Sequence, residues 1–164
     1  MNNNYRSFFA LKKEPFGADI SINDILKTPE LIDVKERFDY VIRIGAIGLV
    51  TGDVGSGKST AIRYAADHLH PAEFKSLYLT ASSGAIMEFY RQLVSELDIH
   101  IKTNSKDMML RLIKKEITQL VCEKKIKVVL LVDEASLLRL EVFAELLTIC
   151  QFEKDSKPYL PIIL

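Results

Sequence analysis

Cysteine and histidine are scarce in this sequence of 164 residues, and tryptophan is absent. The two cysteines, Cys122 and Cys150, have neither a metal-binding nor a redox spacing, so we expect buried thiols in a reducing compartment. His68 and His70 lie at the end of a predicted helix, where a positive charge suits the helix dipole and a metal pair is not favoured. The composition therefore gives no sign of a disulfide framework or a metal site built on cysteine and histidine.

Long apolar runs and net charge are missing too. No stretch approaches the roughly 18 apolar residues of a membrane-spanning helix, and the N-terminus has no apolar signal core, so we expect a cytoplasmic domain. The formal net charge is zero, which excludes a bulk attraction to nucleic acid or to an anionic membrane. The apolar content of 48% is ample for a core, so length and composition predict one globular domain.

One stretch fills every fixed position of a phosphate-binding loop. Residues 52–59 match the pattern G-x-x-x-x-G-K-[ST], the P-loop. Glycines permit backbone angles that turn successive N–H groups toward phosphate oxygens, and the following helix points its N-terminus at the same anion. A glycine-rich turn that matches by accident is the alternative. We predict that a nucleoside triphosphate is bound by Gly52, Asp53, Val54, Gly55, Ser56, Gly57, Lys58, Ser59 and Thr60.

Two side chains of this loop have separate predicted roles. Lys58 places a point charge between the β- and γ-phosphates, and the Ser59 hydroxyl occupies one position on a Mg²⁺ ion that keeps several waters. The flanking sequence agrees. Residues 46–50 predict a short buried strand, and residues 58–70 predict a helix that stops at Pro71.

A second segment supplies the acidic half of the site. Residues 126–132 form a mostly apolar run, rich in β-branched side chains, that ends in Asp133 and Glu134. Ligands of an open parallel sheet bind at the carboxyl ends of its strands, so we expect Asp133 to face Ser59 across the metal. Glu134 and Lys58 are the candidate catalytic residues, with Glu134 as general base or water-positioning group. The alternative is that the two acids only cap a helix.

The remaining segments alternate between helix and strand. Thr28 as N-cap, Pro29 at the first helical position and a terminal Gly45 predict one helix. The apolar spacing predicts a strand at 74–80, helices over 86–97, 108–121 (capped by Ser105) and 137–149, and a last strand at 159–164. Such alternation predicts an α/β fold with a parallel sheet and helices on both faces. Because the chain stops inside the last strand, we expect a longer protein truncated after its fourth core strand.

Basic and acidic residues are unevenly distributed. Residues 102–127 hold eight basic residues and three acids, whereas residues 133–155 hold six acids and two basic residues. A solvated helix face is the usual explanation of such a run. The alternatives are a nucleic-acid-binding patch, or packing of basic on acidic surfaces between neighbouring copies.

Taken together, these residues resemble the AAA+ ATPases, and within them the ExeA-type group of bacterial secretion and transposition ATPases. The resemblance spans essentially the whole chain and rests on the phosphate-binding loop, on Asp133-Glu134-Ala135, and on an aromatic arm, Tyr5-x-x-Phe8-Phe9-x-Leu11-x-x-x-Pro15-Phe16. It implies a three-layer P-loop NTPase fold with a parallel sheet in the AAA+ order 5-1-4-3-2. In that order the strand at 159–164 lies between the phosphate-loop strand and the strand that ends at Asp133.

The resemblance also implies ATP and Mg²⁺ as cofactors and makes Phe16 a candidate contact of the adenine, with ordinary core packing as the alternative. We divide the chain into an N-terminal aromatic arm, residues 1–27, and a partial AAA+ nucleotide-binding domain, residues 28–164, whose lid is missing. The aromatic side chains of the arm are expected to pack against the core. The sequence departs from the family pattern at Gln151, where an asparagine is expected, and has no convincing arginine finger.

Three functions are compatible with these features. The first is an ATP-hydrolysing regulator of DNA transposition that forms a nucleotide-dependent homo-oligomer and has DNA and a transposase as partners. The second is a secretion-pathway ATPase with a membrane partner. The third is a nucleotide switch that holds ATP and barely hydrolyses it. A small-molecule kinase is disfavoured, because Glu134 suits water activation and no acceptor-binding segment is visible.

Overall fold

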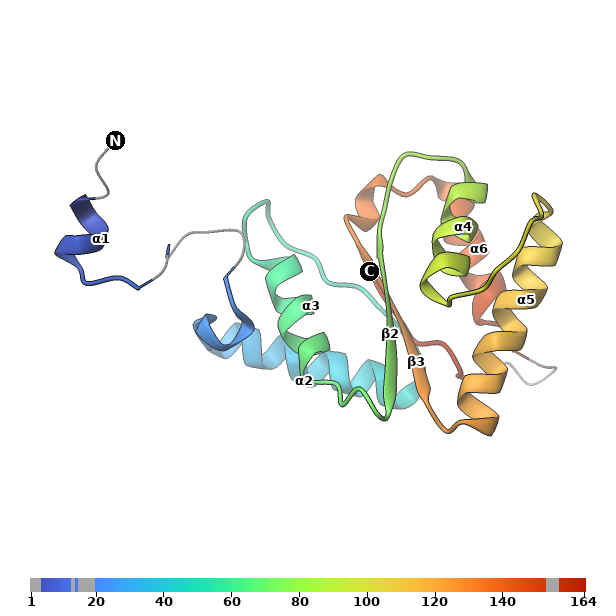
Figure 1. Cartoon of the computed structure of the whole chain (residues 1–164), viewed down its shortest axis with the longest axis horizontal. Helices are drawn as coiled ribbons and strands as arrows, with labels where there is room; N and C mark the ends of the chain where they lie inside the picture. Colours follow the sequence, from blue (N-terminus) through green and yellow to red (C-terminus); the bar gives the residue numbers. More distant parts are fainter. Residues whose placement is uncertain (1–3, 13, 15–19, 153–156) are drawn as a thin grey trace.

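A parallel four-stranded sheet organises the protein, as seen in a computed structural model that describes residues 4–12, 14, 20–152 and 157–164 (Figure 1). Its strands, in spatial order, are β1 (Ile47–Gly48), β4 (Ile162–Ile163), β3 (Lys127–Asp133) and β2 (Phe74–Thr80). All three neighbouring pairs are parallel. The predicted α/β class is confirmed, and the last strand lies between the phosphate-loop strand and β3, as the AAA+ order requires.

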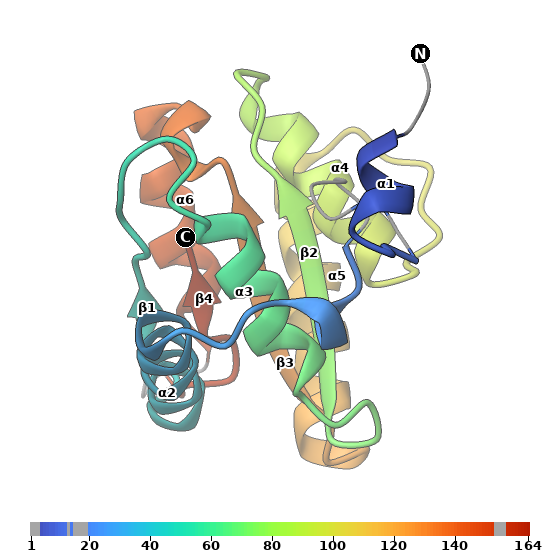
Figure 2. The ribbon, with the colours of Figure 1, turned by 90° about the vertical axis from the view of Figure 1, so that its left-hand side faces the viewer.

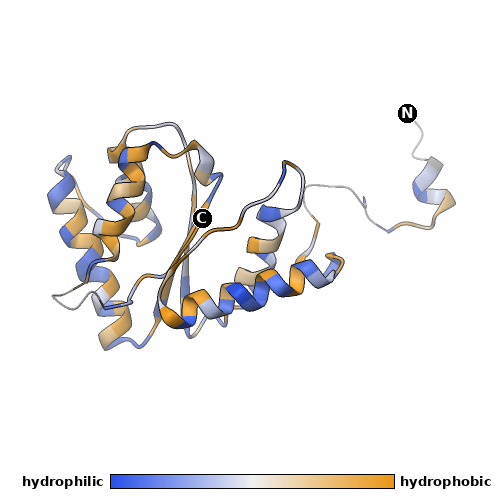
Figure 3. Ribbon diagram, turned by 180° about the vertical axis from the view of Figure 1, so that it is seen from behind, coloured by the Kyte–Doolittle hydropathy of each residue, from blue (hydrophilic) through white to orange (hydrophobic). Residues whose placement is uncertain are grey.

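Helices cover both faces of this sheet: α2 (Pro29–Ile44) and α3 (Lys58–Asp67) on one side, and α4 (Ile86–Glu96), α5 (Lys106–Thr118) and α6 (Leu140–Cys150) on the other (Figure 2). The alternation of side chains along β3 explains both layers. Val128, Leu130 and Val132 pack in the cluster with α4, α5 and α6, whereas Val129 and Leu131 pack with α2 and α3. In Figure 3 the central strands are coloured as hydrophobic, as expected for a sheet buried on both faces.

The helix boundaries follow local chemistry that the sequence predicts. The Thr28 hydroxyl accepts a hydrogen bond from the amide of Leu31, and Gly45 ends α2 in the left-handed conformation at φ 69°. Ser105 caps α5 in the same way through the amide of Met108. Helix α5 then continues into a π-helical turn, η2 (Gln119–Glu123), before β3 begins.

The strand before the phosphate-binding loop is shorter and more exposed than predicted. Residues 46–50 were expected to form a buried strand, but β1 has two residues, and 41% of Ile47 and 67% of Leu49 are exposed. The cause is its position, since β1 lies at one edge of the sheet and its one neighbour among the described strands is the two-residue strand β4.

The N-terminal arm corrects another prediction. Phe8 and Phe9, at the end of the short helix α1 (Asn4–Phe8), are 81% and 66% exposed, and α1 lies far from the sheet (Figure 1). A helix of five residues buries little surface, and the two rings stack edge to face on each other, with centroids 4.9 Å apart. The arm meets the domain further along, where Ile22 and Ile25 pack beside α2 and α3.

The expectation of two buried thiols is wrong for Cys122, which is exposed. The buried positions of α5 and η2 recur at residues 109, 113, 117 and 120, and Cys122 lies on another side of this helix. Cys150 is half-buried, and its burial raises the pKa of the thiol to about 11. Among the described residues, no helix has the length and apolar character needed to cross a membrane.

Candidate nucleotide-binding site

A pocket of about 760 Å³ opens at the carboxyl edge of the sheet, and we call it the carboxyl-edge pocket. Its walls come from two segments far apart in sequence, the loop between β1 and α3 and the residues that follow β3. Parallel strands end at the same edge, which brings these segments together. The lining includes Gly52, Val54, Gly55, Gly57, Lys58, Ser59, Thr60, Asp133 and Glu134.

Two glycines set the backbone shape of the loop, and a third lies close to the loop interior. Gly55 and Gly57 have φ angles of 79° and 87°, which other residues rarely adopt. Gly52 lies close to the Ser56 side chain, since an added Cβ would lie 2.8 Å from the Ser56 hydroxyl, which would have to turn away. The Lys58 ammonium donates hydrogen bonds to the carbonyls of Gly52 at 3.0 Å and Asp53 at 2.8 Å. The loop is thus a cradle with one cation at its mouth.

Asp133 connects the loop to the sheet. Its Oδ1 accepts hydrogen bonds from the Ser59 hydroxyl at 2.9 Å and from the Glu134 amide at 2.9 Å. Its Oδ2 accepts one from the Tyr78 hydroxyl at 2.7 Å. Both oxygens are therefore oriented, and the first turn of α3 is held against the end of β3.

These contacts fix the charges at neutral pH. Desolvation raises the pKa of Asp133, but hydrogen bonds from Tyr78, Ser59 and the Glu134 amide, together with the charge of Lys58, outweigh it and leave the pKa below its usual value. Desolvation and the bond to Asp133 raise the pKa of Tyr78 to about 12. Asp133 is then an ionised acceptor, and Tyr78 is a neutral donor.

Glu134 begins the turn that follows β3. Its backbone is left-handed, at φ 54° and ψ 35°, an uncommon conformation for a residue with a side chain. It precedes the short 3₁₀ helix η3 (Ala135–Leu137), yet its side chain makes no capping hydrogen bond to that helix. The capping alternative therefore does not account for Glu134, whose side chain is exposed at the pocket.

The structure brings most of the predicted site residues together. Asp53 and Ser56 do not line the pocket; the carbonyl of Asp53 accepts from Lys58 and from the amide of Ser56 instead. Phe16, the candidate adenine contact, lies outside the described residues. The residues present suit a magnesium-bound triphosphate, because they offer a cation, a loop with two glycines in the left-handed conformation, and a hydroxyl paired with a carboxylate.

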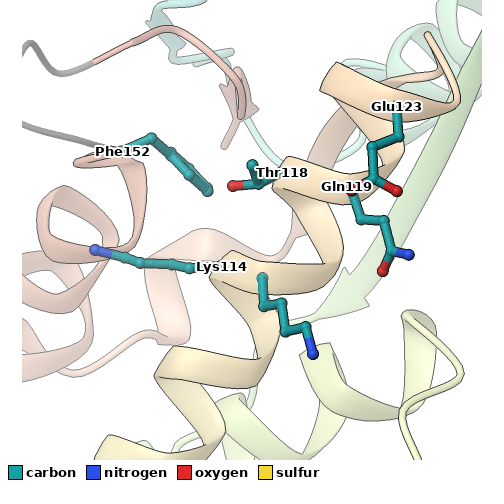
Figure 4. A pocket seen from close by; sticks show the side chains of 6 residues that line it. Lys114, Thr118, Gln119, Glu123 and Phe152 are labelled. Atoms are coloured by element: carbon teal, nitrogen blue, oxygen red, sulfur yellow. The ribbon is translucent and has the colours of Figure 1, made fainter.

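A second hollow, of about 350 Å³, lies away from this edge beside α5 and η2 (Figure 4). The Lys114 ammonium reaches across it toward Phe152, 5.8 Å from the ring centroid, and donates a hydrogen bond to the carbonyl of Gln151 at 2.8 Å. Thr118, Gln119 and Glu123 complete the labelled lining. None of the predicted site residues that the structure describes lines this hollow.

Comparison with known proteins agrees with the carboxyl-edge pocket. A family model described as AAA domain matches residues 43–164, which include the phosphate-binding loop, Asp133 and all four strands. The chain belongs to the AAA domain family. A search of curated proteins finds no match. AAA domains are a family of nucleotide-binding ATPases that generally use ATP and Mg²⁺, and the matched residues contain every described side chain that we assign to this pocket.

Sequence reasoning missed one residue of this AAA domain, Tyr78. Its neighbours on β2, Leu77 and Leu79, are buried, and Tyr78 points to the opposite face, which α3 covers. Thr80 of β2 is aligned with Asp133 of β3 in the parallel register. Tyr78 is two residues before Thr80, so its side chain projects from the same face of the sheet as Asp133. The available signal was a tyrosine that alternates with buried leucines near the carboxyl end of a strand, because such a side chain lies on the opposite face from the leucines.

Proposed function

We propose that the chain binds ATP with Mg²⁺ in the carboxyl-edge pocket and hydrolyses it. One observation supports this most strongly: Lys58, the glycine loop and the Ser59–Asp133 pair converge on one pocket from two segments of the chain. A pocket of about 760 Å³ is also of the size that holds a nucleotide.

Each side chain has a role that follows from its chemistry. Lys58 exchanges its carbonyl partners for phosphate oxygens, which attract an ammonium more strongly than neutral carbonyls do. The Ser59 hydroxyl uses its one proton in the hydrogen bond that it donates to Asp133, so the lone pairs of the hydroxyl oxygen stay available to a metal. Bound Mg²⁺ supplies neutralisation of phosphate charge. Glu134, exposed at the pocket, orients and deprotonates the attacking water.

The substitution Glu134→Gln separates binding from hydrolysis. It removes the proton acceptor but keeps the size of the side chain, so we expect ATP turnover to fall by about 100-fold or more while the affinity for Mg-ATP changes little. The measurements are phosphate release and calorimetric titration on the same preparation. An unchanged slow turnover would instead favour the nucleotide switch.

We further propose a homo-oligomer assembled in response to nucleotide. Leu137, Leu140 and Leu147 are 51%, 85% and 59% exposed on η3 and α6, directly after the acidic end of β3. Leu137 directly follows the pocket-lining residues 133–136, and exposed leucines on neighbouring elements are typical of an interaction surface. Light scattering with and without Mg-ATP tests this proposal, and a monomer under both conditions would contradict it.

For the partners, we propose DNA and a transposase. Several basic residues of the segment 102–127 are engaged within the chain: Lys106 with Glu145, Lys124 with Glu116, and Lys114 with Gln151. Lys102, Arg111, Lys115 and Lys125 are exposed and remain the candidate DNA contacts. DNA binding in low salt that strengthens with ATP supports transposition. Its absence would leave the secretion alternative, which uses the same nucleotide site.

A further inference from the structure

Tyr78 stands out because a strand at the edge of the described sheet, not the phosphate-binding loop, delivers its hydroxyl to Asp133. Strand β2 is outermost in the sheet, and 41% of Tyr78 is exposed. Its ring projects from the face that α3 covers, and the hydroxyl reaches Asp133 Oδ2 at 2.7 Å. A tyrosine that only filled space on an edge strand would not need its hydroxyl to meet this particular carboxylate.

The Oδ2 atom of Asp133 is the oxygen whose orientation depends on Tyr78. Oδ1 is fixed by Ser59 and by the amide of Glu134, but the bond between Cβ and Cγ of an aspartate turns easily, because its torsional preference is broad. A hydrogen bond to Oδ2 from a different strand removes this freedom. Tyr78 therefore determines the plane of the carboxylate to which the Ser59 hydroxyl donates.

We propose that Tyr78 is a positioning residue of the nucleotide site, which orients Asp133 so that Ser59 presents its lone pairs to the Mg²⁺ of a bound nucleotide. This inference rests on the proposed function, because it assigns a task to Tyr78 within that site. Tyr78 acts through Asp133 and touches neither the phosphates nor the metal. Residues that orient metal-binding groups in this way typically change metal affinity or activity by about 10-fold to 100-fold when they are replaced.

The chain provides a matched control for this role. Tyr90 also donates a hydrogen bond from its hydroxyl to a carboxylate oxygen, Glu145 Oε2 at 2.5 Å, but it does so between α4 and α6, where Tyr90 is fully buried and Glu145 is half-buried. Tyr78→Phe and Tyr90→Phe therefore delete the same atom and the same kind of hydrogen bond. Only the first deletion touches the carboxyl-edge pocket.

The experiment measures ATP affinity by calorimetric titration in excess EDTA and in excess Mg²⁺, for the wild type and both variants. Mg²⁺ should raise the ATP affinity of the wild type, and we expect Tyr78→Phe to make this gain about 10-fold smaller. The ATP affinity measured in EDTA should be unchanged. Tyr90→Phe should keep the full gain. In an Asp133→Asn background, Tyr78→Phe should have no further effect, because it acts through the carboxylate.

Several results would overturn the inference. These are an undiminished magnesium gain in Tyr78→Phe, an equal loss with and without Mg²⁺, or a loss that persists in the Asp133→Asn background. A wild type that binds ATP and responds to Mg²⁺ keeps the proposed function intact in all these cases. A wild type that binds no nucleotide under either condition would overturn the proposed function itself.

Discussion

The carboxyl edge of the sheet and the layer formed by α4, α5 and α6 both join a tyrosine hydroxyl to a carboxylate, but in different surroundings. Tyr90 is fully buried, and Glu145 also accepts a hydrogen bond from Lys106 at 2.8 Å, so this network links all three helices. At the carboxyl edge, Asp133 accepts from three donors while Ser59 and Glu134 beside it are exposed. The same kind of contact therefore joins helices in one region and, in our proposal, orients groups toward a ligand in the other.

Lys58→Ala should have the largest effect, and it tests whether the carboxyl edge of the sheet binds a ligand. It removes the described cation at the mouth of the loop, and we expect the affinity for Mg-ATP to fall by at least about 100-fold, which is about 3 kcal/mol. Thermal unfolding without nucleotide should change little, because the hydrogen bonds that Lys58 makes within the described residues go to carbonyls of its own loop. Lys35→Ala, which removes a surface pair with Asp39 on α2, is the matched control and should bind normally.

Tyr90→Phe tests whether the contact in the helix layer stabilises the fold, and its expected effect in free energy is smaller. It deletes a half-buried hydrogen bond to a charged group, so we expect the free energy of unfolding to fall by about 2 kcal/mol at neutral pH, as measured by urea denaturation. Nucleotide affinity should be unchanged. Equal stability of variant and wild type would show that this network does not hold the helices together.

The same variant has a predictable pH dependence. Desolvation raises the pKa of Glu145, but hydrogen bonds from Lys106 and Tyr90 outweigh it and lower the pKa below 4.5. A lowered folded-state pKa contributes stability above the unfolded value, and that stability is lost as the pH falls through the folded value. The difference in the free energy of unfolding between wild type and Tyr90→Phe should therefore become smaller as the pH drops below about 4.5. A constant difference across this range would contradict the assignment to the Glu145 carboxylate.

Local patterns in the sequence predicted the scaffold well. The caps at Thr28 and Ser105 and the strand at residues 74–80 depend on neighbouring residues, and the structure confirms them. The place of the last strand beside β1 follows from the AAA+ resemblance and is confirmed too. Strand β1 was overestimated because its length depends on its only described partner, β4, more than 100 residues away.

The contacts that complete the site were not accessible from sequence spacing. Tyr78 and Asp133 are 55 positions apart, and Lys106 and Glu145 are 39 apart. Each pair depends on which strands or helices are neighbours in space, which a charge count over a segment does not reveal. The run of lysines at 102–127 illustrates this, since some of them are paired within the chain and others face solvent.

Backbone amide chemical shifts recorded during a titration with Mg-ATP test the central claim most directly, because they locate the ligand residue by residue. We predict the largest changes at the amides from Gly55 to Thr60 and at Glu134, with little change in α5. Changes concentrated around Lys114 and Phe152, or no changes at all, would contradict a triphosphate held between the glycine loop and the end of β3.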